Sequence, residues 1–295
     1  MLVERLFNPE LFNPELFNFS TRIYGIILGV YSLVTLFAAS ILSPFFVEVT
    51  PEVRTTYVSL GKIVEDRPLQ VTDTRIGFDT GDFGRFGIRN WEVSSLSGRR
   101  SDAHRHACYH SEFGPTWQYD INFAEDWRLK SDLTRSWTLY RGFRKQYESS
   151  NRSYDWWQLD QSLENPYLVP FYRIRRCTHG RDFLYFKAGL RRKIPLFLEC
   201  LSVTPSVFAE GGNARGFKRT FGKNIDGSGW GGGGVSSISF RLELGWRIAD
   251  YLSAYAYVEQ YDVVGGNARR TNAASTFRCA HNDWTHGGFG LRLRF

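Results

Sequence analysis

The chain has 295 residues, enough for one large domain or two small ones. Its 37 Lys and Arg residues exceed its 30 Asp and Glu residues, and the formal net charge is +7. Because the basic residues are spread along the whole chain, nucleic acid is not a predicted partner. The mean hydropathy of −0.33 is that of a soluble protein. It does not exclude a membrane, since the strands of a membrane barrel are apolar only at every second position.

The N-terminal segment has the features of an export signal. A tandem LFNPE repeat precedes Arg22, an apolar run extends from Ile23 to Ala39, and Ala38-Ala39-Ser40 supplies small residues for cleavage. The run is shorter than the about 20 apolar residues of a transmembrane helix. The segment before Ile23 is net negative, which leaves a downstream start site or an uncleaved anchor as alternatives. We predict a signal peptide in residues 1–40 and one domain in residues 41–295.

From Val53 onward the chain shows period-two alternation rather than a helical period. In 235–248, apolar residues at every even position from Ile238 to Ile248 alternate with polar residues and Gly245. Segments 114–123, 251–264 and 284–295 are similar. Less regular candidates are 53–63, 68–79, 83–94, 127–142, 155–164, 167–177, 182–193 and 198–209. These segments predict about twelve strands, each long enough to cross a bilayer at a tilt.

The connections between these segments alternate in length. Tight-turn sequences occur at 80–82, 125–126, 165–166, around Pro195 and at 249–250. Longer polar segments occupy 95–113, 143–154, 210–234 and 265–282, and we expect short connections near 64–67 and 178–181. A soluble antiparallel sandwich also has period two, but it does not need large apolar residues on one face of nearly every strand. The sequence therefore predicts an all-β, up-and-down antiparallel transmembrane barrel of about 12 strands.

The last strand carries its apolar residues on one face and ends on an aromatic residue. These residues are Phe289, Leu291, Leu293 and Phe295. The pattern resembles the C-terminal signature of bacterial outer-membrane barrels, which the outer-membrane assembly machinery is thought to recognise. The resemblance implies an outer-membrane location in a Gram-negative-type bacterium. The implied partners are the lipid bilayer, lipopolysaccharide, the assembly machinery and small solutes.

A second resemblance involves residues 57–70. Tyr57-Val58-Ser59, Gly61-Lys62 and Pro68-Leu69-Gln70 are similar to the first hairpin of porins of the TorF type. Proteins of that type often have an aromatic residue and Arg where this chain has Leu60 and Gly61. The resemblance implies a small porin barrel and names no substrate.

The sequence contains no recognisable catalytic set. It lacks a G-x-S-x-G motif, and all histidines except His286 fall in predicted loops: His104, His106, His110, His179 and His281. An extended segment would present His104, His106, Cys108 and His110 on one side, as metal ligands require. Neighbouring Arg99, Arg100 and Arg105 disfavour a cation there. We therefore predict no catalytic residue, no metal and no cofactor, and a membrane-embedded hydrolase is the least favoured function.

Arginines alternate with apolar residues in the last strands. On a lipid face each Arg would cost about 2–4 kcal/mol at the midplane, so Arg241, Arg247, Arg292 and Arg294, together with Glu243, are predicted to face the lumen. We expect a porin-like barrel for passive passage of small solutes, with anion preference if it conducts. If the arginines pair with carboxylates across the lumen, a non-conducting structural or scaffolding barrel is the alternative. The pairing of Cys108, Cys177, Cys200 and Cys279 stays open.

Overall fold

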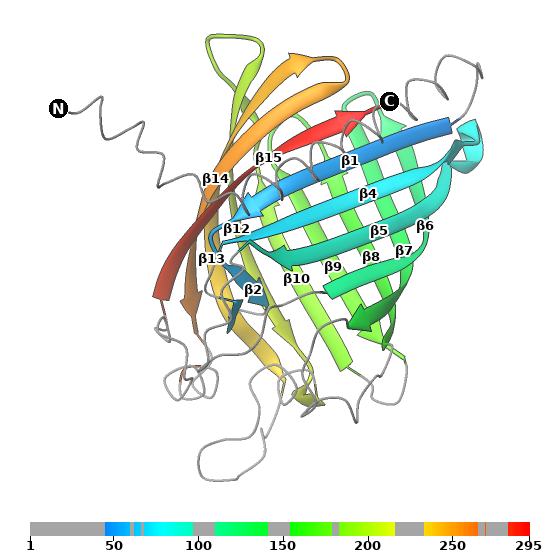
Figure 1. The fold of residues 1–295 in the computed structure, drawn as a ribbon. Helices are drawn as coiled ribbons and strands as arrows, with labels where there is room; N and C mark the ends of the chain where they lie inside the picture. The colour runs from blue at the N-terminus through cyan, green and yellow to red at the C-terminus, as the bar shows by residue number, and fades with distance from the viewer. Residues whose placement is uncertain are drawn as a thin grey trace, which may run out of the picture. The chain divides into compact units, whose positions relative to one another are not determined.

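A computed structural model shows that the chain folds into a closed antiparallel β-barrel (Figure 1). The structure describes residues 45–59, 62–65, 68–96, 110–140, 154–178, 183–215, 233–264, 269 and 283–295. The predicted signal peptide, residues 1–40, lies outside these ranges. The predicted all-β up-and-down barrel of about 12 strands is confirmed.

Twelve described strands form the wall, and each pairs with its neighbour along the chain. They are β1 (Phe45–Arg54), β4 (Leu69–Asp79), β5 (Arg85–Ser95), β6 (His110–Ala124), β7 (Trp127–Tyr140), β8 (Tyr154–Glu164), β9 (Val169–Cys177), β10 (Phe183–Arg191), β12 (Leu201–Gly212), β13 (Gly234–Ala249), β14 (Leu252–Val263) and β15 (Asp283–Arg294). The barrel closes because β1 pairs with β15, with Val49 opposite Leu293 and Val53 opposite Phe289. Backbone hydrogen bonds between Val47 and Phe295 extend this pairing.

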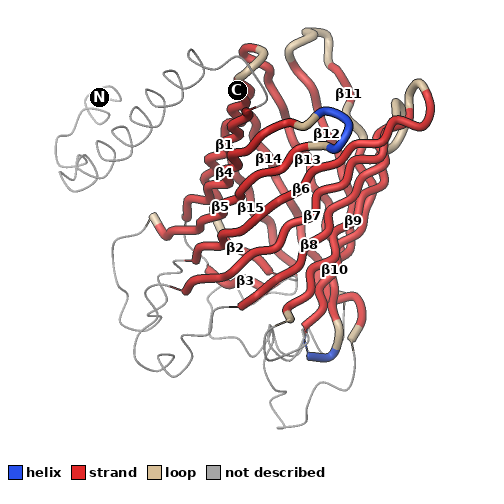
Figure 2. The backbone as a smooth tube through the Cα atoms, turned by 90° about the vertical axis from the view of Figure 1, so that its right-hand side faces the viewer, coloured by secondary structure: helices blue, strands red, loops and turns tan. Residues whose placement is uncertain are grey.

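Alternation of side chains gives the wall two chemically different faces. In β13 the six apolar residues at even positions from Ile238 to Ile248 are all exposed on the outside. On the opposite face Ser237 and Ser239 are buried, and Arg241 and Glu243 are half-buried. Figure 2 shows the strands running side by side at a common tilt. In the part of the chain that the structure describes, no helix is long and apolar enough to cross a membrane.

The five predicted tight turns all lie at one end of the barrel, here called the turn end. In the β4–β5 turn, residues Gly81–Phe83 form a 3-10 helix η2, and Gly84 has a φ of 84°, which favours glycine. In the β8–β9 turn, the Asn165 side chain accepts hydrogen bonds from the backbone N–H groups of Tyr167 and Leu168, both 2.9 Å long. A short strand β11 (Ile194–Pro195) lies in the β10–β12 connection. The opposite end, here called the loop end, carries the other connections.

The start of the barrel differs from the prediction. The first wall strand is β1, not the predicted strand 53–63, whose residues are divided between the end of β1 and a hairpin of β2 (Tyr57–Ser59) and β3 (Lys62–Glu65). The predicted short connection at 64–67 is likewise wrong, because residues 55–68 separate β1 from β4. Both expectations failed for one reason: a hairpin inside a barrel has the same local extended pattern as a wall strand.

Candidate functional site

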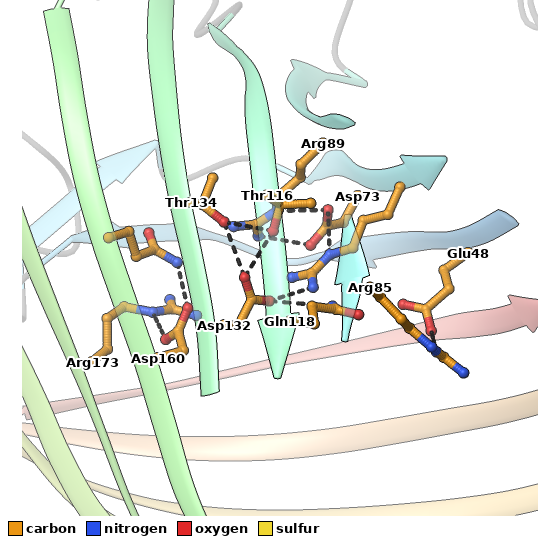
Figure 3. A network of polar contacts seen from close by, with 12 residues as sticks. Glu48, Asp73, Arg85, Arg89, Thr116, Gln118, Asp132, Thr134, Asp160 and Arg173 are labelled. Carbon is orange, nitrogen blue, oxygen red and sulfur yellow. Dashed lines mark hydrogen bonds and ion pairs between the residues drawn. The ribbon is translucent and has the colours of Figure 1, made fainter. Parts of the chain in front are cut away.

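Polar contacts on the inner face of β4, β5, β6 and β7 form a cluster in the centre of Figure 3, which also shows ion pairs of the neighbouring strands. Arg89 donates to both carboxylate oxygens of Asp73, over 2.9 and 2.7 Å. Asp132 accepts hydrogen bonds from Thr116 (2.9 Å) and Thr134 (3.1 Å) and from Arg75. We call these residues the polar ladder: Asp73, Arg75, Arg89, Thr116, Asp132 and Thr134. Because every charge in the ladder has an opposite charge beside it, the ladder makes this wall nearly neutral.

The wall formed by β13, β14 and β15 brings several sequence-predicted residues together. Glu243 accepts one hydrogen bond from Arg241 and one from Arg292, each 2.7 Å long. Arg241 also lies 3.6 Å from Glu259 of β14. Arg247 and Arg292 lie at the same level of the wall, on either side of Ser253, because Ser253 is the register partner of both.

Arg294 lies away from this group. Its Nε is 3.5 Å from an Oε1 of Glu48 on β1, and Arg85 of β5 approaches the same oxygen to 3.6 Å. Sequence reasoning missed Glu48, although it alternates with Val47 and Val49. This alternation indicates a strand, but Pro51 argues against one, and the preceding apolar segment hides where the strand begins.

The basic partner of most inward ion pairs is more exposed than the acidic partner. The side-chain exposures are 69% for Arg294 against 18% for Glu48, and 39% for Arg292 against 15% for Glu243. The same order holds for Arg128/Asp120, Arg173/Asp160, Lys187/Glu210 and Arg191/Glu164. The polar ladder is an exception, because Arg75 and Arg89 are only 15% and 14% exposed. In these pairs the basic groups are therefore more accessible on the inner face, and the carboxylates are less exposed.

The β2–β3 hairpin contacts two apolar clusters of the inner wall. Tyr57 packs against Leu69, Val71 and Val93, and its ring centroid lies 6.2 Å from that of Trp91. Val58 packs against the cluster of Phe208, Tyr261 and Trp284. The first cluster belongs to β4 and β5, and the second belongs to β12, β14 and β15. The hairpin therefore lies inside the wall near the loop end (Figures 1 and 2).

Glu52 is a buried acceptor that sequence reasoning also missed. Its carboxylate accepts hydrogen bonds from Tyr255 and Tyr257, both 2.8 Å long, and from Arg54 at 2.6 and 3.2 Å. These contacts tie β1 to β14 across β15. Charge-assisted hydrogen bonds of this kind fix the relative position of the strands.

The remaining candidate chemistry is sparse in the described ranges. No group of three or more His, Cys, Asp and Glu side chains there could hold a metal ion. His104, His106, Cys108 and Cys279 lie outside those ranges, and His110 begins β6. Cys177 ends β9 at the loop end and Cys200 lies at the turn end, so a disulfide between these two is excluded.

The outer face of the barrel determines where the protein resides. Large apolar side chains such as Phe240, Trp246 and Phe289 are exposed on it, whereas the ion pairs described above face inward. A closed barrel satisfies its backbone hydrogen bonds without water, and an apolar exterior of this extent is stable in hydrocarbon. The protein is a bacterial outer-membrane β-barrel. Barrels of this class have short turns on the periplasmic side and longer loops outside, so we expect the turn end to face the periplasm.

Comparisons with known proteins add no assignment beyond the fold. No protein-family model and no curated protein sequence matches this outer-membrane barrel. It is similar to the solved structure of KdgM porin in complex with disordered oligogalacturonate, with 10% identity, 85% of this chain and 99% of that chain covered, and a TM-score of 0.44. NanC porin is 8% identical, with 84% of this chain and 98% of that chain covered and a TM-score of 0.45. LpxR from Salmonella typhimurium is 7% identical, with 84% of this chain and 99% of that chain covered and a TM-score of 0.44. The resemblance of residues 57–70 to porins of the TorF type stays a prediction.

Proposed function

We propose that the barrel is a porin-like channel for the passive passage of small solutes and that it prefers anions. The observation that supports this proposal is the unequal exposure of the inward ion pairs, with Arg292 and Arg294 more exposed than Glu243 and Glu48. An ion in the lumen therefore approaches guanidinium groups more closely than carboxylates. A low-dielectric wall concentrates their field on the water path and increases the effect.

The size of the preference follows from Coulomb's law. In water, an anion about 4 Å from a guanidinium and about 7 Å from its carboxylate gains about 0.4 kcal/mol net per pair. Cations lose the same amount. Two such pairs along the path separate anions from cations by about 1.6 kcal/mol, which is roughly a fifteenfold ratio.

The test is a reversal potential in a salt gradient across a planar bilayer. The double variant Arg292→Gln with Arg294→Gln should move the reversal potential toward zero, because it removes two exposed positive charges. Glu243→Gln serves as the control of opposite sign and should strengthen the anion preference. A wild-type channel that selects cations, with a reversal potential unaffected by the double variant, would contradict the proposal.

The second candidate function is a non-conducting structural or scaffolding barrel. The hairpin that packs against the inner wall through Tyr57 and Val58 favours it, since the hairpin occupies part of the lumen near the loop end. Single-channel recording separates the two functions. Folded wild-type protein that inserts into bilayers without conductance steps would support the structural barrel.

A further inference from the structure

Basic residues are rare on the outer face of the described wall strands. Only Arg135 of β7 and Arg176 of β9 occupy outward positions there, as the side-chain alternation of these strands shows. The strand register places them in one row, because Trp157 of β8 is the partner of both. Arg135, Trp157 and Arg176 therefore form a compact basic patch, and most of the outer surface around it is apolar or uncharged.

Contacts within this patch orient the first arginine. Arg135 donates to Asp155 through Nη2 (2.8 Å) and Nε (3.2 Å). Its guanidinium carbon lies 5.2 Å from the ring centroid of Trp137 and 5.5 Å from that of Trp157. These interactions use one edge of the guanidinium and leave Nη1 outside the two hydrogen bonds. The patch therefore presents two guanidinium groups beside the Asp155 carboxylate.

The height of the patch in the membrane follows from strand geometry. Trp127 begins β7 at the turn end, and Arg135 lies eight residues further along the same strand. At about 3.3 Å per residue and a tilt of about 40°, the two are separated by about 20 Å along the membrane normal. The apolar band of such barrels is about 25 Å tall. Arg135 therefore lies near the outer boundary of the hydrocarbon, from which a long side chain can reach the headgroups.

The residues on the two sides of the patch along the strands have the chemistry expected at this boundary. On the membrane side of the patch lies a purely apolar row formed by Leu133, Leu159 and Ile174. On the other side Trp137 is exposed beside Asp155. Tryptophan is enriched where acyl chains meet headgroups. Acyl chains can cover the apolar row while an anionic headgroup contacts the arginines.

We propose that Arg135, Trp157 and Arg176 form a binding site for a lipid phosphate in the outer leaflet, that is, a phosphate group of lipid A. Guanidinium groups match phosphate in geometry and charge, and an arginine that is weakly hydrated loses little on leaving water. The tryptophan fills the space between the two arginines and contacts the glucosamine–acyl boundary. The site lies outside the lumen, so it is independent of whether the barrel conducts.

The experiment measures binding of defined lipids to the full chain in detergent micelles by native mass spectrometry. Wild-type protein should bind bisphosphorylated lipid A roughly tenfold more tightly than the phosphate-free form. Each basic residue near an anionic lipid adds electrostatic attraction to the binding free energy. Arg135→Gln with Arg176→Gln should abolish that difference. Arg135→Lys with Arg176→Lys should retain only part of it, because lysine keeps the charge but not the planar geometry.

The matched control is Arg128→Gln with Arg173→Gln, which removes the same charge from the same two strands on their inward face. It should retain the preference for the phosphorylated lipid. Equal binding of the two lipids by wild-type protein would overturn the proposal, and so would a preference that persists in Arg135→Gln with Arg176→Gln. Displacement of the lipid by an equal concentration of inorganic phosphate would also overturn it, because the site would then bind free anions.

Discussion

Removing the β2–β3 hairpin should open the barrel without breaking its wall. Arg54 at the end of β1 and Leu69 at the start of β4 are register partners, so a short turn can connect them. In the variant considered, residues 57–65 are replaced by a short Gly-Ser linker. The lumen then loses the contacts that Tyr57 and Val58 make with the inner wall.

The expected gain in conductance follows from the dimensions of the barrel. Twelve strands about 4.8 Å apart and tilted by about 40° enclose a radius of about 12 Å to the backbone. Side chains occupy about 5 Å of this radius, which leaves a bore of about 150 Å². A two-stranded hairpin about 10 Å wide and about 10 Å thick covers about 100 Å² of that area. Conductance should therefore rise about threefold when the hairpin is removed.

Single-channel recording in planar bilayers tests this value. As a control, Pro166 and Tyr167 in the β8–β9 turn are replaced by Gly-Ser, which changes neither charge nor the loop end and should leave the conductance unchanged. A milder variant, Tyr57→Ser with Val58→Ser, keeps the hairpin but removes its apolar contacts and should give frequent brief openings. An unchanged conductance in the hairpin-deleted protein, with the barrel still folded by circular dichroism, would refute the reasoning.

Three further predictions concern stability, assembly and processing. Glu52→Ala should lower the free energy of unfolding in lipid vesicles by about 3–5 kcal/mol, since it leaves the half-buried guanidinium of Arg54 and two buried tyrosine hydroxyls without their carboxylate. A loss below about 1 kcal/mol in urea titrations would contradict this. Deleting Phe295, whose ring centroid lies 5.7 Å from that of Tyr251, should slow membrane insertion sharply. Arg294→Ser on the inward face should not slow it, and equal insertion rates of the two variants would exclude an assembly role for Phe295. N-terminal sequencing of membrane-extracted protein should find a start near Ile41, and retention of residues 1–40 would show that the segment is not cleaved.

Much of the wall was predictable because neighbouring positions in a barrel strand meet opposite solvents. Lipid selects an apolar residue such as Phe240, and the next position, Arg241, faces the interior. This requirement is local, so it appears in the sequence as period two. The tight turns were predictable for a related reason, since residues such as Gly81 and Asn165 adopt or stabilise a conformation within the turn itself.

Only the tertiary structure decided which charges meet and which extended segment leaves the wall. Arg292 reaches Glu243 because the register of β13, β14 and β15 brings them together, and no local pattern encodes that register. Arg135 and Arg176 likewise become neighbours only through Trp157. The segment around Val58 has the pattern of a wall strand, but it lies in the interior because its apolar contacts are with strands far away in the sequence. Alternation determines the conformation of each strand, whereas contacts distant in sequence determine its neighbours.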